Sequence, residues 1–158
     1  MKITCVTAIA TACVAAGVLA AVFAEGTRAQ ASAAEPLPQQ RGFGAFLSTD
    51  KAVYRPGEPI RITFKVFNHT PTPVRFDFNS GQRYDVVVRD GQGKEVWRWS
   101  AGRLFTMALG QETLGPARPR LTYEAVCTAE LGPGRYRITA FLTDVRRRLS
   151  ATLRIEVQ

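Results

Sequence analysis

The residues that could catalyse a reaction are few, and they do not form a recognised catalytic set. The only histidine, His69, lies in the stretch Asn68-His69-Thr70-Pro71, where an expected strand ends in a proline-containing loop. A serine hydrolase needs a base beside its nucleophile, and no serine occurs in a nucleophile-elbow pattern. We therefore predict that the chain is not an enzyme and that His69 is an exposed turn residue.

Three aspartates could be taken for the carboxylate pair of a glycosidase. Asp77 and Asp85 alternate with apolar neighbours in expected strands, and Asp90 begins an expected turn. A glycosidase needs two carboxyl groups at a set separation across the substrate. A solvated strand face for Asp77 and Asp85 and a turn cap for Asp90 explain these residues more simply. Because one histidine cannot supply a multi-histidine metal site, we also expect no metal and no cofactor.

Two other residue types have a structural and a functional interpretation. Trp97 and Trp99 are two positions apart, so both side chains lie on one face of one strand. If that face points inward they belong to the core, and if it points outward they form a platform for a sugar or a peptide. Cys127 alternates with the apolar residues of its strand, which favours a small buried hydrophobe over a reactive thiol.

The elements that must position these residues are β-strands, because apolar residues recur with a period of two. The expected strands cover residues 45–49, 60–67, 74–78, 84–89, 95–99, 121–127, 136–142 and 149–157. The sequence Asp90-Gly91-Gln92-Gly93 is typical of a hairpin turn, in which glycine accepts a positive φ. About eight strands without an amphipathic helix predict an all-β, immunoglobulin-like antiparallel β-sandwich, with a closed barrel as the alternative. Residues 101–119 form the longest stretch without clear alternation, and a short strand at 104–109 is the alternative to a loop there.

The N-terminal part of the 158-residue chain is different from the rest. Lys2 precedes an uncharged, apolar run over residues 3–24 that ends in Val22-Phe23-Ala24, which is typical of a secretory signal peptide. We predict a signal peptide at 1–24, a flexible linker at 25–41 and one domain at 42–158, exported to the periplasm or the extracellular space. In the alternative the first segment stays uncleaved as an N-terminal membrane anchor, and membrane contact is expected only in that case.

The charge is strongly basic, with 21 Lys and Arg against 13 Asp and Glu and a formal net charge of +8. The arginines are spread along the chain, and the one cluster, Arg146-Arg147-Arg148, falls in the turn before the last expected strand. This distribution favours a dispersed, solvated surface with some affinity for anionic lipid or polymer. We expect no nucleic-acid partner.

Two sequence elements carry a family resemblance, and both lie within Phe76 to Leu109. Their residues are Ser80, Gly81, Gln82, Tyr84 and Asp85 in the first element and Trp97, Trp99 and Ser100 in the second. Together they closely resemble the signature of the BsuPI domain, which is named for an intracellular proteinase inhibitor of bacilli. The likeness covers about residues 48–144. It implies an immunoglobulin-like fold and inhibition of a subtilisin-like serine protease, so that the partner is a protein.

The loop after the second element supplies the candidate inhibitory segment. It comprises Arg103, Leu104, Phe105, Thr106 and Met107 and offers large apolar side chains suited to a subtilisin-like pocket. The alternative is an immunoglobulin-like envelope module for interaction or scaffolding, with no protease target, in which Phe105 belongs to the core.

Overall fold

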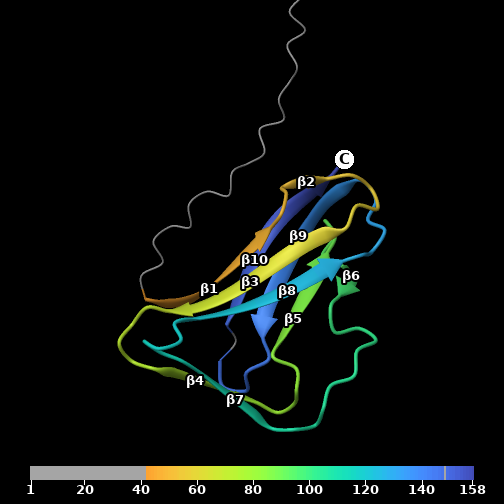
Figure 1. Ribbon diagram of the computed structural model, residues 1–158. Helices are drawn as coiled ribbons and strands as arrows, with labels where there is room; N and C mark the ends of the chain where they lie inside the picture. The colour runs from red at the N-terminus through yellow and green to blue at the C-terminus, as the bar shows by residue number, and fades with distance from the viewer. Residues whose placement is uncertain (1–41, 148) are drawn as a thin grey trace, which may run out of the picture.

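The computed structural model of the chain describes residues 42–147 and 149–158, and this part consists of ten β-strands without a helix (Figure 1). No helix there could cross a membrane. The expected signal peptide (1–24), the expected linker (25–41) and Arg148 lie outside the described residues. The strands are β1 (Phe43–Thr49), β2 (Val53–Tyr54), β3 (Ile60–Asn68), β4 (Val74–Phe78), β5 (Tyr84–Arg89), β6 (Glu95–Arg98), β7 (Gly110–Leu114), β8 (Arg120–Cys127), β9 (Gly134–Leu142) and β10 (Ser150–Val157).

Two sheets form the two layers of a sandwich. One has the strand order β1-β3-β8 and the other the order β2-β10-β9-β5-β6. In Figure 1 the three-stranded sheet lies in front of β10, β9 and β5. The strands pair antiparallel except for the two-residue β2, which runs parallel to β10. This arrangement confirms the predicted all-β, immunoglobulin-like sandwich.

The core lies between the two sheets and is built by the alternation seen in the sequence. On β3, Ile60, Ile62 and Phe64 are buried while the residues between them face outward. On β9, Ile138 and Ala140 are fully buried. Cys127 at the end of β8 is buried as expected, and this burial raises the pKa of its thiol.

The strand count differs from the expected number at two places. The two residues of β2 are too few to produce a visible alternation. The strand in the 101–119 region is β7 at Gly110–Leu114, which pairs with β4 in a separate two-stranded ribbon, so the alternative of a strand at 104–109 is wrong. In β7 Leu114 is fully buried, whereas the other four residues are exposed or half-buried, so a period of two was not recognisable.

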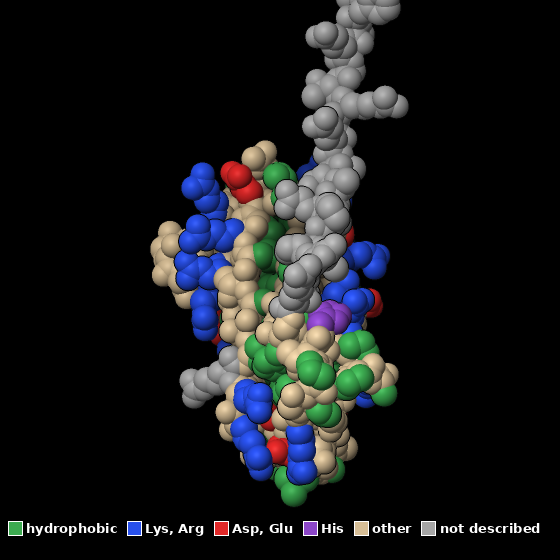
Figure 2. Space-filling view, turned by 90° about the vertical axis from the view of Figure 1, so that its left-hand side faces the viewer, with side chains coloured by type: hydrophobic (Ala, Val, Ile, Leu, Met, Phe, Trp, Pro, Cys, Tyr) green, Lys and Arg blue, Asp and Glu red, His purple; other side chains and the backbone are tan. Residues whose placement is uncertain are grey.

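The arginines are spread over the surface, but three of them form a row that the sequence did not show. Figure 2 shows Lys and Arg side chains along the left-hand side of the view, which is the side of the five-stranded sheet, and also on the right and at the lower end. The antiparallel register places Arg89, Arg137 and Arg154 side by side on three adjacent strands of that sheet. Strand pairing thus adds one local row to the otherwise dispersed arginines, because it brings together residues that are far apart in sequence.

Candidate functional site

The signature residues meet at one end of the sandwich, beside the loop at 101–109. Ser80, Gly81 and Gln82 lie in the turn between β4 and β5, and Tyr84 and Asp85 begin β5. Trp97 lies in β6, and Trp99 and Ser100 follow it directly. The backbone N–H of Trp99 donates a hydrogen bond of 2.9 Å to the carbonyl oxygen of Val86, which keeps the start of the loop against β5.

Asp85 fixes the point at which β6 ends and the loop begins. Its Oδ2 accepts hydrogen bonds from the Ser100 hydroxyl at 2.7 Å and from Arg98 Nη1 at 2.8 Å. Its Oδ1 accepts the Ser100 backbone N–H at 3.1 Å. Only 3% of Asp85 is exposed, so the expected solvated face is wrong for this residue. The reason is the partner set: a buried carboxylate is tolerated where charged and backbone donors satisfy it.

Trp97 and Trp99 pack against the core on the inner side of the sheet. The Trp99 ring stacks on Tyr84 with 4.2 Å between centroids, and Tyr84 in turn stacks on Tyr123 of the other sheet at 4.7 Å. The Tyr84 hydroxyl donates a 2.6 Å hydrogen bond to the carbonyl oxygen of Glu124. Burial raises the pKa of Tyr84, with Arg103 opposing the effect. Trp99, Tyr84 and Tyr123 therefore form an aromatic stack that joins the two layers and supports the loop, while Trp97 only packs against the core.

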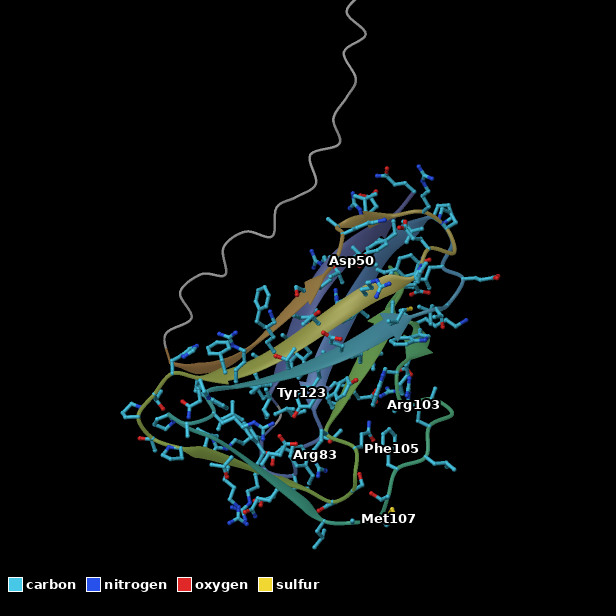
Figure 3. The ribbon with its side chains drawn as sticks, viewed as in Figure 1. Asp50, Arg83, Arg103, Phe105, Met107 and Tyr123 are labelled. Atoms are coloured by element: carbon cyan, nitrogen blue, oxygen red, sulfur yellow. The ribbon has the colours of Figure 1, made fainter. Side chains whose placement is uncertain are left out.

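The loop is attached to the sandwich at three points, and Figure 3 shows how Arg103, Phe105 and Met107 follow one another along it. Arg103 Nε donates a 2.8 Å hydrogen bond to the carbonyl oxygen of Trp99, and its guanidinium carbon lies 4.4 Å from the centre of the indole ring. The half-buried Phe105 ring lies 5.8 Å from that of Trp99. The backbone N–H of Gly81 donates a 2.7 Å hydrogen bond to the carbonyl oxygen of Thr106. A methyl group on Gly81 would lie 2.5 Å from Thr106 Oγ1, so the close approach depends on this glycine.

Between and beyond these attachments the apolar side chains point into solvent. Leu104 is 100% exposed, Met107 is 89% exposed and Leu109 is 83% exposed. Isolated exposed leucines are common on protein surfaces, but three large apolar side chains on one supported loop are not explained by packing.

The remaining candidate residues for catalysis are held in separate places. Asp77 forms ion pairs with Arg75 at 2.9 Å and with Arg146 at 3.0 Å, and the hydrogen bond from Arg75 is the main cause that lowers the pKa of Asp77. Asp90 Oδ1 accepts the backbone N–H groups of Gln92 and Lys94, as expected for a turn cap. Within residues 42–147 and 149–158 there is no group of three His, Cys, Asp or Glu that could hold a metal ion.

Comparison with known families gives one match. The sequence model of the BsuPI family, described as intracellular proteinase inhibitor, matches residues 47–147. The chain belongs to the BsuPI family. This membership confirms the resemblance seen in the sequence, and the family is described as one of proteinase inhibitors. No curated protein sequence matches the chain.

Solved structures similar to this BsuPI chain include three of different kinds. The sporulation control protein Spo0M from Bacillus subtilis is 16% identical with a TM-score of 0.47, over 75% of this chain and 50% of that one. The alkylpurine DNA glycosylase AlkC from Pseudomonas fluorescens is 16% identical with a TM-score of 0.44, over 75% of this chain and 31% of AlkC. A CARDB domain from Pyrococcus furiosus is 16% identical with a TM-score of 0.42, over 73% of this chain and 91% of that domain. This chain thus spans half the length of Spo0M.

Sequence reasoning missed one residue that supports the BsuPI loop. Arg83 Nη1 donates a 2.6 Å hydrogen bond to the carbonyl oxygen of Ser80, and Arg83 Nε lies 3.2 Å from Glu112 Oε1 on β7. The guanidinium carbon lies 4.6 Å from the centre of the Phe78 ring. Arg83 therefore joins the signature turn to the strand that follows the loop. Its only signal in the sequence was its place inside the first signature element.

Proposed function

We propose that the chain inhibits a subtilisin-like serine protease by placing the loop from Arg103 to Met107 in the active-site cleft. The observation that carries the proposal is the contrast within the loop between exposed apolar side chains and residues attached to the sandwich. Leu104 and Met107 are exposed, while Arg103, Phe105 and the Thr106 carbonyl contact the sandwich. A protease pocket that takes large apolar side chains would remove Leu104 from water, and burying one leucine contributes roughly 1.5–3 kcal/mol.

The attachments of the loop matter because ordering a flexible loop on binding would offset part of the favourable binding free energy. Immobilising a side chain on binding costs about 0.5–1.5 kcal/mol each, and loop ordering adds to this. Here the ordering is supplied in the free chain by the indole of Trp99 and the backbone of Gly81. No disulfide takes part, since within the described residues the one cysteine, Cys127, is buried and free.

The proposed role of Leu104 is to enter the specificity pocket, with Met107 occupying a neighbouring subsite. Leu104 is the more exposed of the two and is flanked directly by the attached residues Arg103 and Phe105. The proposal also includes the sequence-based expectation that the domain is exported, in which case the target protease is periplasmic or extracellular.

The test is a titration of a subtilisin-like protease with the full chain and with substituted chains. We expect inhibition by the wild type, strong weakening by L104D and M107D, and retention by L104F, which keeps a large apolar side chain. The matched control is V145D, which puts the same charge at another exposed apolar loop residue. Undiminished protease activity at micromolar wild-type chain, or equal weakening by L104D and V145D, contradicts the proposal.

A further inference from the structure

A row of arginines crosses the outer face of the five-stranded sheet. Arg137 on β9 lies directly opposite Arg89 on β5 and opposite Arg154 on β10. Residues directly opposite each other in antiparallel strands have Cβ atoms about 5 Å apart. Arg135, two residues earlier on β9, lies on the same face. All four side chains are exposed, and together we call them the arginine face.

Little negative charge compensates the arginine face. Among the described residues, no carboxylate oxygen lies within 4.0 Å of the guanidinium groups of Arg135, Arg137 or Arg154. Arg89 has one distant partner, Glu95, at 3.8 Å. Like charges directly opposite each other destabilise a sheet, so this arrangement has a cost to the fold that an anion would remove.

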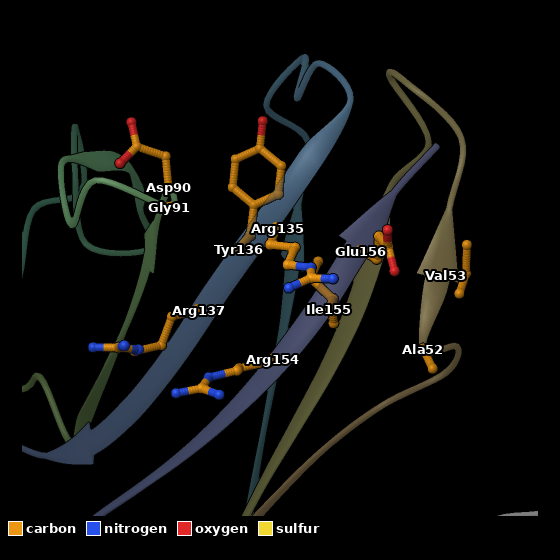
Figure 4. Close-up of a pocket in the computed structure, with 10 residues that line it drawn as sticks. All are labelled: Ala52, Val53, Asp90, Gly91, Arg135, Tyr136, Arg137, Arg154, Ile155 and Glu156. Atoms are coloured by element: carbon orange, nitrogen blue, oxygen red, sulfur yellow. The ribbon is translucent and has the colours of Figure 1, made fainter.

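A shallow groove adjoins the row (Figure 4). It has a volume of about 580 Å³ and lies between β2 and the turn that joins β5 to β6. Figure 4 shows the side chains of Arg137 and Arg154 extending in the same direction from neighbouring strands. Two acidic residues also line the groove, of which Asp90 is committed to its turn. The other, Glu156, lies opposite Arg135 in the strand register.

We propose that the arginine face binds the surface of a membrane that contains anionic phospholipids, by contact with their phosphate groups. Guanidinium groups pair with phosphate in a bidentate geometry, and four of them on one flat face can meet several headgroups at once. Each basic residue near an anionic surface strengthens binding roughly fivefold. The face lies on β5, β9 and β10, away from the loop at 103–107, so the proposal is independent of protease inhibition.

A membrane fits this face better than single-stranded nucleic acid does. Proteins that bind single strands without sequence preference combine a basic groove with aromatic side chains on which bases stack. The outward residues next to the row in the strand register are Val87, Thr139 and Thr152, none of which is aromatic. Tyr136 is the one aromatic residue that lines the adjoining groove, and its hydroxyl is hydrogen-bonded to the carbonyl oxygen of Gly132. A single ring is not a platform on which successive bases stack.

The experiment measures binding of the full chain to vesicles of phosphatidylcholine alone and of phosphatidylcholine mixed with phosphatidylglycerol. We expect tighter binding to the anionic vesicles, lost as salt rises from about 0.1 M to about 1 M and the screening length falls from about 10 Å to about 3 Å. R137Q/R154Q should weaken that binding by about 25-fold. The matched control R61Q/R120Q removes the same charge from exposed positions of the three-stranded sheet and should bind nearly as the wild type does.

Three results overturn the proposal. The first is equal binding to both kinds of vesicle, which would mean that the apolar N-terminal segment and not the arginine face is responsible for binding. The second is an equal loss of anionic binding in the two double variants. The third is arginine-dependent binding to a single-stranded oligonucleotide without any preference for anionic vesicles. Thermal denaturation of both variants checks their folding, and R137Q/R154Q should be no less stable than the wild type because like charges are removed.

Discussion

Removal of the Asp85 carboxylate should destabilise the domain more than any other single change at the signature. In D85A the Ser100 backbone N–H loses its acceptor, and Arg98 loses the more buried of its two acidic partners. An unsatisfied buried donor costs about 1–3 kcal/mol, and removing one member of a buried ion pair costs about 3–5 kcal/mol. Arg98 is partly exposed and keeps Glu95, which reduces the second figure. We therefore expect a loss of about 2–4 kcal/mol.

The assay is thermal and urea denaturation of the wild type, D85A, D85N and E95Q. For a domain of this size the loss in D85A corresponds to a fall in Tm of roughly 10 °C. D85N keeps an acceptor for Ser100 and should lie between D85A and the wild type. E95Q removes the exposed partner of Arg98 and the distant partner of Arg89, and should cost less than about 1 kcal/mol. A loss below about 1 kcal/mol in D85A, or equal losses in D85A and E95Q, would show that Asp85 is not the main stabilising acceptor at this turn.

Three further predictions follow from single contacts. G81A should weaken protease inhibition by roughly tenfold, as expected for loss of the hydrogen bond between Gly81 and Thr106. In the double variant G81A/T106A inhibition should return, because T106A removes the Oγ1 atom that the new methyl group meets. Independent, additive effects of the two substitutions would contradict this coupling. Y123F should leave stability unchanged or raise it, because the Tyr123 hydroxyl is buried without a hydrogen-bond partner among the described residues. A clear fall in Tm would show instead that the hydroxyl makes a stabilising contact. Burial, and then the hydrogen bond to Asp50, raises the pKa of Tyr54 from 10.0 to about 12. The stability that neutral Tyr54 contributes is therefore complete below pH 10 and disappears as the pH rises toward 12. This loss of stability should be smaller in Y54F, and an equal loss in Y54F and the wild type would exclude Tyr54 as the cause.

The sandwich could be predicted from the sequence because its signal is local. The alternation of apolar and polar residues along β3, β9 and β10 depends on which face of each strand meets the core, and it is visible in consecutive residues of the sequence. The strands that were missed lack this signal, since β2 has two residues and β7 is largely exposed or half-buried.

The candidate site could be predicted only in part, because its geometry comes from contacts between distant residues. The sequence indicated the loop at 103–107, but not its attachment to Gly81 or the burial of Asp85 by Ser100 and Arg98. The arginine row has the same origin, because Arg89, Arg137 and Arg154 become neighbours only through strand register. Parity within one strand shows which residues share a face, while the partner strand decides whether a charge on that face is paired.

The proposed inhibition requires that the loop from Arg103 to Met107 occupy the active-site cleft of a protease. The most direct measurement is amide hydrogen exchange of the full chain, alone and with a subtilisin-like protease whose catalytic serine has been replaced. We predict new protection at residues 103–107, with no change on the outer faces of β3 and β8. Protection confined to other surfaces, or no protection at all with saturating protease, would contradict the claim.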